Sequence, residues 1–323
     1  MSCLVAVKLL MIFAIIAVGW GAAHSRVFAG GAVASTASNL AFYIFIPALL
    51  FRTTARIDLG TLPWAVFGVF FGPAVGLLLV VYGWHRLRRV SPPAAPAVRA
   101  IATTFGNSVQ LGLPIVTTLF GEAGLSILIG IISVHALTLL TVATILAELD
   151  LARAQARADG ARPRIIAIVR VVLRRAAFHP VVLPVLLGMG WNLLGIPLPA
   201  AGDELLGTLA QAVAPLCLVA IGLSLAHYGM AGALRQAAAL AVGKLLVLPA
   251  LVLVVAHWGA GLHGVPLATV VLFAALPVGS NPLLFAQRYD ARQAEVTAGI
   301  LTSMLAFTVI GPGWLVLASL VAP

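Results

Sequence analysis

The sequence predicts an all-α polytopic membrane protein with ten transmembrane helices, arranged as two inverted five-helix repeats. Three observations predict this class: a shortage of charge, ten long apolar segments, and proline positions that recur in both halves. Of the 323 residues, 62% are hydrophobic and 9% are charged, and the mean hydropathy is +1.12. Soluble domains carry about 25% charged residues. Most of the surface must therefore face lipid.

Ten segments are apolar enough to span a bilayer, since a helix of ~20 apolar residues crosses ~30 Å of hydrocarbon. The first resembles a cleavable signal peptide, but its apolar run is longer and the repeat requires it, so we interpret it as a retained span. The predicted spans are 3–23, 33–52, 63–84, 98–120, 123–147, 178–196, 205–227, 234–257, 265–287 and 294–320.

A basic segment, 148–177, separates the first repeat, 1–147, from the second, 178–323. It carries seven arginines and is typical of an amphipathic cytoplasmic linker. We expect a multi-pass protein of the cell (inner) membrane. With this linker in the cytoplasm, both termini lie on the outer side, and the positive-inside rule is satisfied. The net charge of +10 then reflects topology and anionic headgroups rather than a nucleic-acid partner. The further basic residues on the cytoplasmic side are Arg26, Arg86, Arg88, Arg89, Arg99, Arg235, Arg288 and Arg292.

Prolines inside the spans indicate the internal repeat. Pro47 and Pro215 are 168 residues apart, and so are Pro114 and Pro282. A unit of five spans reverses its direction in the membrane when it is repeated. The design therefore matches the inverted repeats of secondary transporters, in which paired interrupted helices mark the binding site.

Helices 4 and 9 are the predicted interrupted pair, with "FGNSVQLGLP" at 105–114 and "LPVGSNPLLFAQRYD" at 276–290. Pro114, Pro277 and Pro282 each remove a backbone donor and free a carbonyl. Such groups persist in a membrane only inside protein or beside a watery cavity. The half-helices that follow begin with free N–H groups carrying roughly +0.5 charge, and Asn281 with Pro282 predicts one such start. Two facing N-terminal ends form a site for an anion.

Neutral polar side chains accompany these breaks. Asn107, Gln110, Ser280 and Asn281 supply donors and acceptors suited to a carboxylate and its surroundings. The alternative is that they only satisfy the interrupted backbone. Because polar residues inside spans usually mark substrate paths, we predict that they bind substrate.

Three more residues are candidates for the same cavity. Asn39 and Tyr43 lie one turn apart before Pro47, and either line the cavity or serve in packing. Lys244 is the one formal charge deep in a predicted span. It either balances an anionic substrate, stands where related folds hold sodium, or extends its stem toward the interface.

Several other classes of function are disfavoured. All nine acidic residues fall in loops or near predicted helix ends, which argues against cation antiport. Cys3 and Cys217 lie far apart in apolar runs, so we expect no disulfide framework and no metal site. "GAGLHG" at 259–264 lacks the strand and acidic partner of a dinucleotide site. We expect no cofactor and no enzymatic activity, because neither a nucleophile with its base nor clustered carboxylates are visible.

The two motifs together resemble the auxin efflux carrier family, which includes plant auxin exporters and bacterial malate and malonate permeases. The resemblance covers the whole chain, including Ala286 and Tyr289 after the ninth-span motif. It implies that helices 4 and 9 cross at the substrate site, with Asn107 as a ligand. Val109 and Gln110 depart from the usual pattern of relatives. The family shares its fold with sodium/proton antiporters and bile-acid symporters, which move as elevators.

The resulting hypothesis is a secondary carrier for a small organic anion, auxin-like or a mono- or dicarboxylate. Helices 4 and 9 belong to a transport core, and helices 1, 2, 6 and 7 to a scaffold that is also a candidate homodimer interface. The expected partners are the organic anion and the lipid bilayer. A membrane-embedded enzyme and a sensor built on a transporter-like fold are the alternatives.

Overall fold

The computed structural model describes residues 11, 14–25, 31–56, 64–158, 182–228 and 233–321. Our expectations for the start of the first span, for Arg26 and for linker residues 159–177 lie outside these ranges. Every named element within the ranges is a helix, which confirms the all-α class. Six of the helices described are long and apolar enough to cross a membrane: Ala32–Ala55, Val66–Leu87, Leu119–Ala158, Ala200–His227, Leu234–Gly259 and Gln293–Val321.

The first half of the chain contains a helix over 14–22 and the segments that follow it. α6 consists of two helices joined at a kink at Gly121, where φ is 59° and ψ is −146°. It also continues to Ala158, so the first eleven residues of the basic linker extend the fifth predicted span as helix. The named elements are α2 (Gly31–Leu40), the π-helical turn η1 (Ala41–Phe45), α3 (Ile46–Ala55), α4 (Trp64–Leu87), α5 (Ala95–Thr104), η2 (Ser108–Gly112) and α6 (Leu113–Ala158).

The second half begins, in the described ranges, at α8. The predicted ninth span is two helices, α12 and α13, with five residues between them. The elements are α8 (Val182–Leu193), α9 (Ala200–Tyr228), α10 (Leu234–Val242), η3 (Gly243–Val247), α11 (Leu248–Val254), η4 (Val255–Gly259), α12 (Gly264–Ala275), α13 (Asn281–Arg288) and α14 (Gln293–Val321).

Three of the π-helical turns have the same cause. η1, η2 and η3 each end two residues before a proline: Pro47, Pro114 and Pro249. Proline cannot donate to the carbonyl four residues earlier and its ring crowds that carbonyl, and a widened turn relieves the crowding. Pro249 frees the carbonyl of Leu245, which accepts a hydrogen bond of 2.7 Å from the indole of Trp314.

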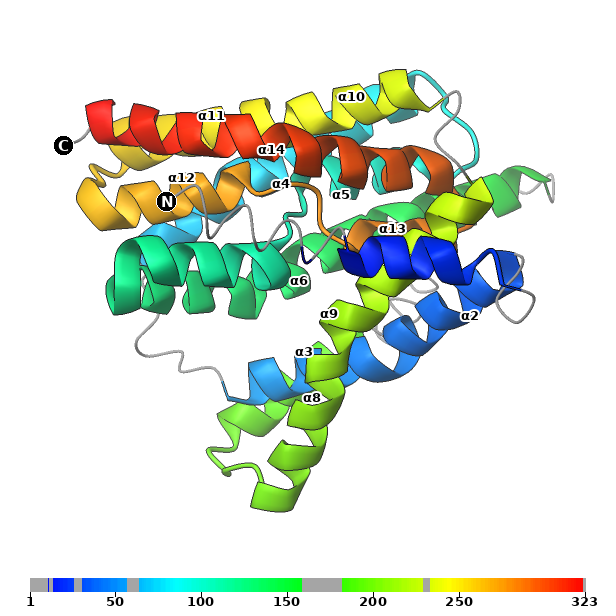
Figure 1. Cartoon of the computed structure of the whole chain (residues 1–323), viewed down its shortest axis with the longest axis horizontal. Coiled ribbons are helices and arrows are strands. Elements are labelled where there is room, and N and C mark those ends of the chain that lie inside the picture. The colour runs from blue at the N-terminus through cyan, green and yellow to red at the C-terminus, as the bar shows by residue number, and fades with distance from the viewer. Residues whose placement is uncertain are drawn as a thin grey trace.

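The helices form two groups (Figure 1). α2, α3, α8 and α9 pack against one another and extend to one side, whereas α4, α5, α10–α12 and α14 form the larger body. Glycines allow the close approach within the smaller group and between α9 and the helix over 14–22. A Cβ on Gly188 of α8 would lie 2.0 Å from Thr54 Oγ1 of α3, and one on Gly222 of α9 would lie 2.1 Å from the Ile16 carbonyl.

A buried ion pair joins two helices of the larger body. Arg99 of α5 donates to both carboxylate oxygens of Glu295 of α14, at 2.7 and 2.8 Å. The two side chains are only 12% and 7% exposed. A two-pronged guanidinium–carboxylate contact of this kind fixes geometry as well as charge. It therefore ties the half-helix that precedes the fourth-span break to the last helix of the chain.

Candidate functional site

Two interruptions of the helices lie side by side. α5 ends at Thr104 and α12 ends at Ala275, and the extended residues after each pair as an antiparallel bridge between Gly106 and Val278. The amide of Asn107 donates to the Pro277 carbonyl at 2.8 Å, and the amide of Gly279 donates to the Phe105 carbonyl at 3.0 Å. Buried backbone groups need such partners. Each interruption therefore satisfies the backbone of the other.

Glycine permits this contact. A Cβ on Gly279 would lie 2.8 Å from the carbonyl oxygen of Gly106, closer than side chains tolerate. The amide of Val278 donates to the hydroxyl of Ser303 at 3.0 Å, and this serine of α14 is fully buried. The bridge is thus held from one side by backbone and from the other by α14.

The interruptions differ from the sequence expectation in position. In the fourth span the helix stops before Gly106, eight residues ahead of Pro114, because η2 absorbs that proline within a helical segment. In the ninth span the residue that precedes the helix is Ser280 rather than Asn281, and its side chain makes no capping hydrogen bond. Asn281 is the first helical residue, so the predicted cap was one residue late.

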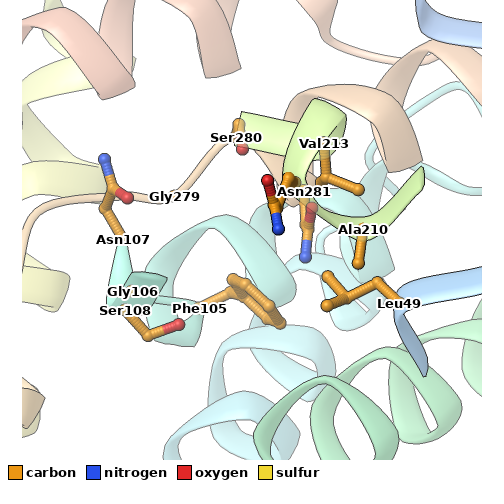
Figure 2. Close-up of a pocket in the computed structure, with 11 residues that line it drawn as sticks. Leu49, Phe105, Gly106, Asn107, Ser108, Ala210, Val213, Gly279, Ser280 and Asn281 are labelled. Carbon is orange, nitrogen blue, oxygen red and sulfur yellow. The ribbon is translucent and has the colours of Figure 1, made fainter. Parts of the chain in front are cut away.

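A cavity of about 130 Å³ lies beside the bridge (Figure 2). The interruptions supply one wall, and α3 and α9 supply the other. Its polar groups are amides and hydroxyls, and none of the eleven residues that line it is charged. They are Leu49, Phe105, Gly106, Asn107, Ser108, Ala210, Gln211, Val213, Gly279, Ser280 and Asn281.

Three of the residues that the sequence singled out line this cavity: Asn107, Ser280 and Asn281. Asn107 is 4% exposed. In the described part of the chain its side chain has no hydrogen-bond partner, so its amide is available to a ligand. The side chains of Gln110 and Pro114 lie outside what the structure describes.

The other candidates are placed elsewhere. Pro277 and Pro282 shape the ninth-span interruption without lining the cavity. Asn39 and Tyr43 are exposed, and the guanidinium of Arg288 lies over the Tyr43 ring at 5.5 Å. The structure does not bring these two residues to the site.

Lys244 lies behind the bridge rather than in the cavity. It is 1% exposed, and its ammonium donates to the carbonyl of Ala274, at the end of α12. A Cβ on Gly106 would lie 3.3 Å from Nζ, so the ammonium is directly behind that residue. The cation is therefore fixed one layer away from the residues that line the cavity.

Sequence reasoning missed several lining residues, of which Gln211 on α9 is the most polar. A signal for it was present, because Gln211 lies four residues before Pro215, so its carbonyl is the one that this proline leaves free. Ser108 was also missed, although it directly follows Asn107.

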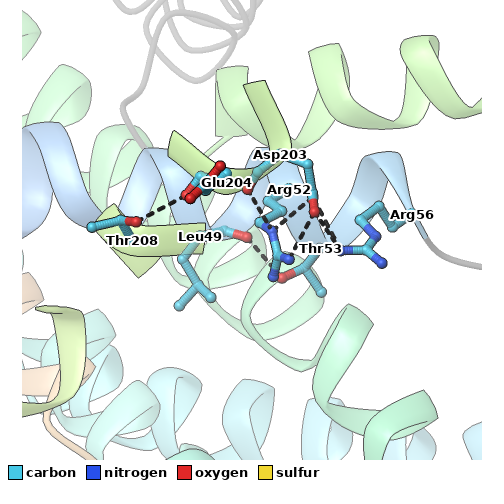
Figure 3. A network of polar contacts seen from close by, with 7 residues as sticks. All are labelled: Leu49, Arg52, Thr53, Arg56, Asp203, Glu204 and Thr208. Atoms are coloured by element: carbon cyan, nitrogen blue, oxygen red, sulfur yellow. Dashed lines mark hydrogen bonds and ion pairs between the residues drawn. The ribbon is translucent and has the colours of Figure 1, made fainter. Parts of the chain in front are cut away.

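An ionic network borders the cavity through Leu49 (Figure 3). One turn along α3, Arg52 donates to both oxygens of Asp203 at 2.9 and 3.1 Å. Arg56 donates to the same carboxylate at 3.0 Å. This network holds α3 to α9, the two helices that form the second wall of the cavity.

Comparison with known proteins identifies the family of the chain. Residues 4–315 match the family described as membrane transport protein. The chain is 25% identical over 264 residues to a candidate malonate transporter of Rhizobium meliloti, which covers 81% of this chain and 80% of the relative.

Two other relatives extend the range of organisms. An uncharacterized transporter of Methanothermobacter thermautotrophicus is 25% identical over 283 residues, 87% of this chain and 88% of that protein. Auxin efflux carrier component 1 of Arabidopsis thaliana is 30% identical over 144 residues, 43% of this chain and 23% of that protein. These matches confirm the resemblance that the sequence motifs indicated.

Proposed function

We propose that this chain, which belongs to the membrane transport protein family, is a secondary carrier of a small organic anion. The observation that carries the proposal is the neutral polar cavity where the two interrupted helices meet. The proposed substrate site consists of Asn107, Ser108, Gln211, Ser280 and Asn281.

The proposed topology is ten spans in two inverted repeats, with the fourth and ninth helices crossing at the site. Six described helices have the length and composition of spans. The interrupted segments 95–120 and 264–288 are proposed as a matched pair of further spans. Neither is a single long helix, so helix length does not identify them as spans. Their antiparallel pairing at Gly106 and Val278 is the relation expected of upside-down copies.

In this proposal, no positively charged side chain touches the carboxylate of the substrate. The amides of Asn107 and Asn281 and the hydroxyl of Ser280 donate to it. The N-terminal turns of η2 and α13 add partial positive charge. Lys244, one layer back, adds positive charge behind the bridge when its amine is protonated.

The size of the cavity favours a small acid. About 130 Å³ is room for several water molecules and suits a compact mono- or dicarboxylate. One relative is named for malonate and another for auxin. We propose the compact acid as substrate, because an indole acid requires the two walls to separate.

Movement of the larger helix group against the smaller one provides alternating access in this proposal. The α3 and α9 wall presents Leu49, Ala210 and Val213 to the interruptions. Within the described ranges, sliding across these apolar side chains breaks none of the ion pairs, whereas Arg52 and Asp203 keep α3 and α9 together. The arrangement therefore supports an elevator with α2, α3, α8 and α9 as the fixed part.

The test is flux into liposomes, which also separates a carrier from a sensor or an enzyme. Asn107→Ala removes a proposed ligand, and Asn39→Ala removes the same group from an exposed position on α2. Hydrogen bonds to charged groups contribute about 1.5–3 kcal/mol, so we expect malonate uptake to fall about 10- to 100-fold in Asn107→Ala alone. Equal uptake by both variants at unchanged membrane yield refutes the site, and binding without flux in the wild type refutes the carrier.

A further inference from the structure

A second cavity, of about 460 Å³, has a different chemical character from the first. It lies among the C-terminal end of α4, the loop that leads into α5, and the C-terminal end of α6. These segments meet at one end of the larger helix group (Figure 1). The residues lining it are Arg86, Leu87, Arg89, Val90, Ser91, Pro93, Pro96, Asp150, Arg153, Ala154 and Arg157.

Positive charge in this cavity exceeds the negative charge that faces it. Arg86 donates to the Tyr82 hydroxyl at 2.7 Å and pairs with Asp150. Arg153 lies 3.5 Å from the same carboxylate. Asp150 is thus the one acidic side chain among the lining residues, and two arginines already share it.

The two other arginines that line the cavity do not contact Asp150. Arg89 and Arg157 are exposed, and within the described ranges neither side chain has an ion pair or a hydrogen bond. Among the residues that line the cavity, four guanidinium groups face one carboxylate, an excess of three positive charges. Like charges gathered around one cavity repel one another, so an anion that enters it relieves the repulsion.

One wall of the cavity, the loop between α4 and α5, is tied to its neighbours. After α4 the backbone turns through Arg89, whose φ is 51°, and the amide of Val90 returns to the His85 carbonyl at 3.2 Å. The carbonyl of Ser91 accepts a hydrogen bond from Arg292, which precedes α14. The loop that carries Arg89 is therefore anchored to α4 and to the α14 side.

A neighbouring contact is typical of the level of lipid headgroups. The guanidinium of Arg88 lies 4.2 Å from the centre of the Trp84 ring, at the end of α4. Tryptophan gathers at membrane interfaces, and arginine gathers on the cytoplasmic side. Basic pockets between helices on that side bind anionic headgroups.

We propose that this arginine cavity binds a phosphate-bearing anion. The planar fork of guanidinium matches two phosphate oxygens at once. An anionic phospholipid headgroup and a free phosphate offer the same group, and the experiment distinguishes these two sources. The site is separate from the cavity beside the bridge, which we call the carboxylate cavity after its proposed ligand. It shares no lining residue with that cavity and does not depend on the proposed transport activity.

The experiment titrates delipidated, full-length protein in detergent with cardiolipin, phosphatidylcholine or inorganic phosphate and follows thermal unfolding. The pocket variant is Arg89→Gln with Arg157→Gln. The control variant, Arg235→Gln with Arg288→Gln, removes the same charge from exposed positions outside the cavity. A third protein, Arg89→Lys with Arg157→Lys, keeps the charge but loses the forked geometry, and remains informative if the pocket variant folds poorly.

We expect cardiolipin to stabilise the wild type and phosphatidylcholine to have no effect. Each basic residue near anionic lipid contributes about 1 kcal/mol, so the pocket variant should bind cardiolipin about 30-fold more weakly, and the control within threefold of wild type. Loss of affinity for inorganic phosphate in the pocket variant alone identifies a soluble phosphate as the ligand of the same site. Equal losses in pocket and control variants, or no binding of either probe by the wild type, overturn the proposal.

Discussion

Gly279→Ala tests the pairing of the two interruptions, on which the carboxylate cavity depends. The new methyl group would lie 2.8 Å from the Gly106 carbonyl oxygen and 3.2 Å from a ring carbon of Phe105. Ordinary contact begins at 3.4 Å, so the two backbones must separate by about 0.6 Å. The nearest atoms belong to backbone, which cannot rotate away as a flexible side chain would.

The cost follows from the hydrogen bonds at the bridge. The two backbone bonds between the interruptions measure 2.8 and 3.0 Å, and the separation moves both beyond the usual limit of about 3.2 Å. Each contributes about 1 kcal/mol net, and overpacking adds about 1–3 kcal/mol. We expect Gly279→Ala to destabilise the protein by about 3–5 kcal/mol and to abolish malonate uptake.

Thermal unfolding in detergent and uptake into liposomes measure the two effects. Gly83→Ala is the matched control, because Gly83 lies within α4 and a Cβ there meets no atom within 4 Å. Alanine in a helix interior is favoured over glycine by about 0.5–1 kcal/mol, so the control should unfold at an equal or higher temperature. If Gly279→Ala matches this control in stability and uptake, the interruptions do not need their close contact.

Three other substitutions test further parts of the structure. Lys244→Met should lower malonate uptake at least tenfold in the liposome assay without lowering the unfolding temperature, because apolar replacement of a buried charge is often neutral or stabilising. Arg99→Met leaves Glu295 buried and unpaired, so it should cost about 3–5 kcal/mol in thermal unfolding, and adding Glu295→Leu should restore most of that loss. Trp314→Phe removes the donor to the Leu245 carbonyl and should cost about 1–2 kcal/mol by the same measurement; an unchanged unfolding temperature would show that water or another group satisfies this carbonyl.

The sequence predicted the helical class and the presence of polar interruptions, because composition and local chemistry determine both. It did not predict where the fourth-span helix stops. A proline can be accommodated locally by a widened turn, as at Pro114, whereas the extended residues at Gly106 persist because Val278 pairs with them. That partner is 172 residues away, and no local pattern reveals it.

Rotation about the helix axis explains the placement of Asn39 and Tyr43. Their spacing of four puts them on one face with Pro47 only in a regular α-helix. The π-helical turn η1 lies within this stretch and adds a residue to the turn. The face therefore shifts, Tyr43 becomes 45% exposed, and Leu49 reaches the cavity instead.

The neutral lining of the carboxylate cavity suits a carrier for a physical reason. A guanidinium in direct contact would bind an organic anion strongly and would itself require compensation when the cavity is empty. Amides, hydroxyls and helix ends bind the anion more weakly and need no counter-ion. The side-chain nitrogen of Lys244 already donates to the Ala274 carbonyl, so it needs no carboxylate in the cavity as a partner. In the proposed carrier, the attraction is therefore weak enough for release as well as strong enough for entry, as transport through a membrane demands.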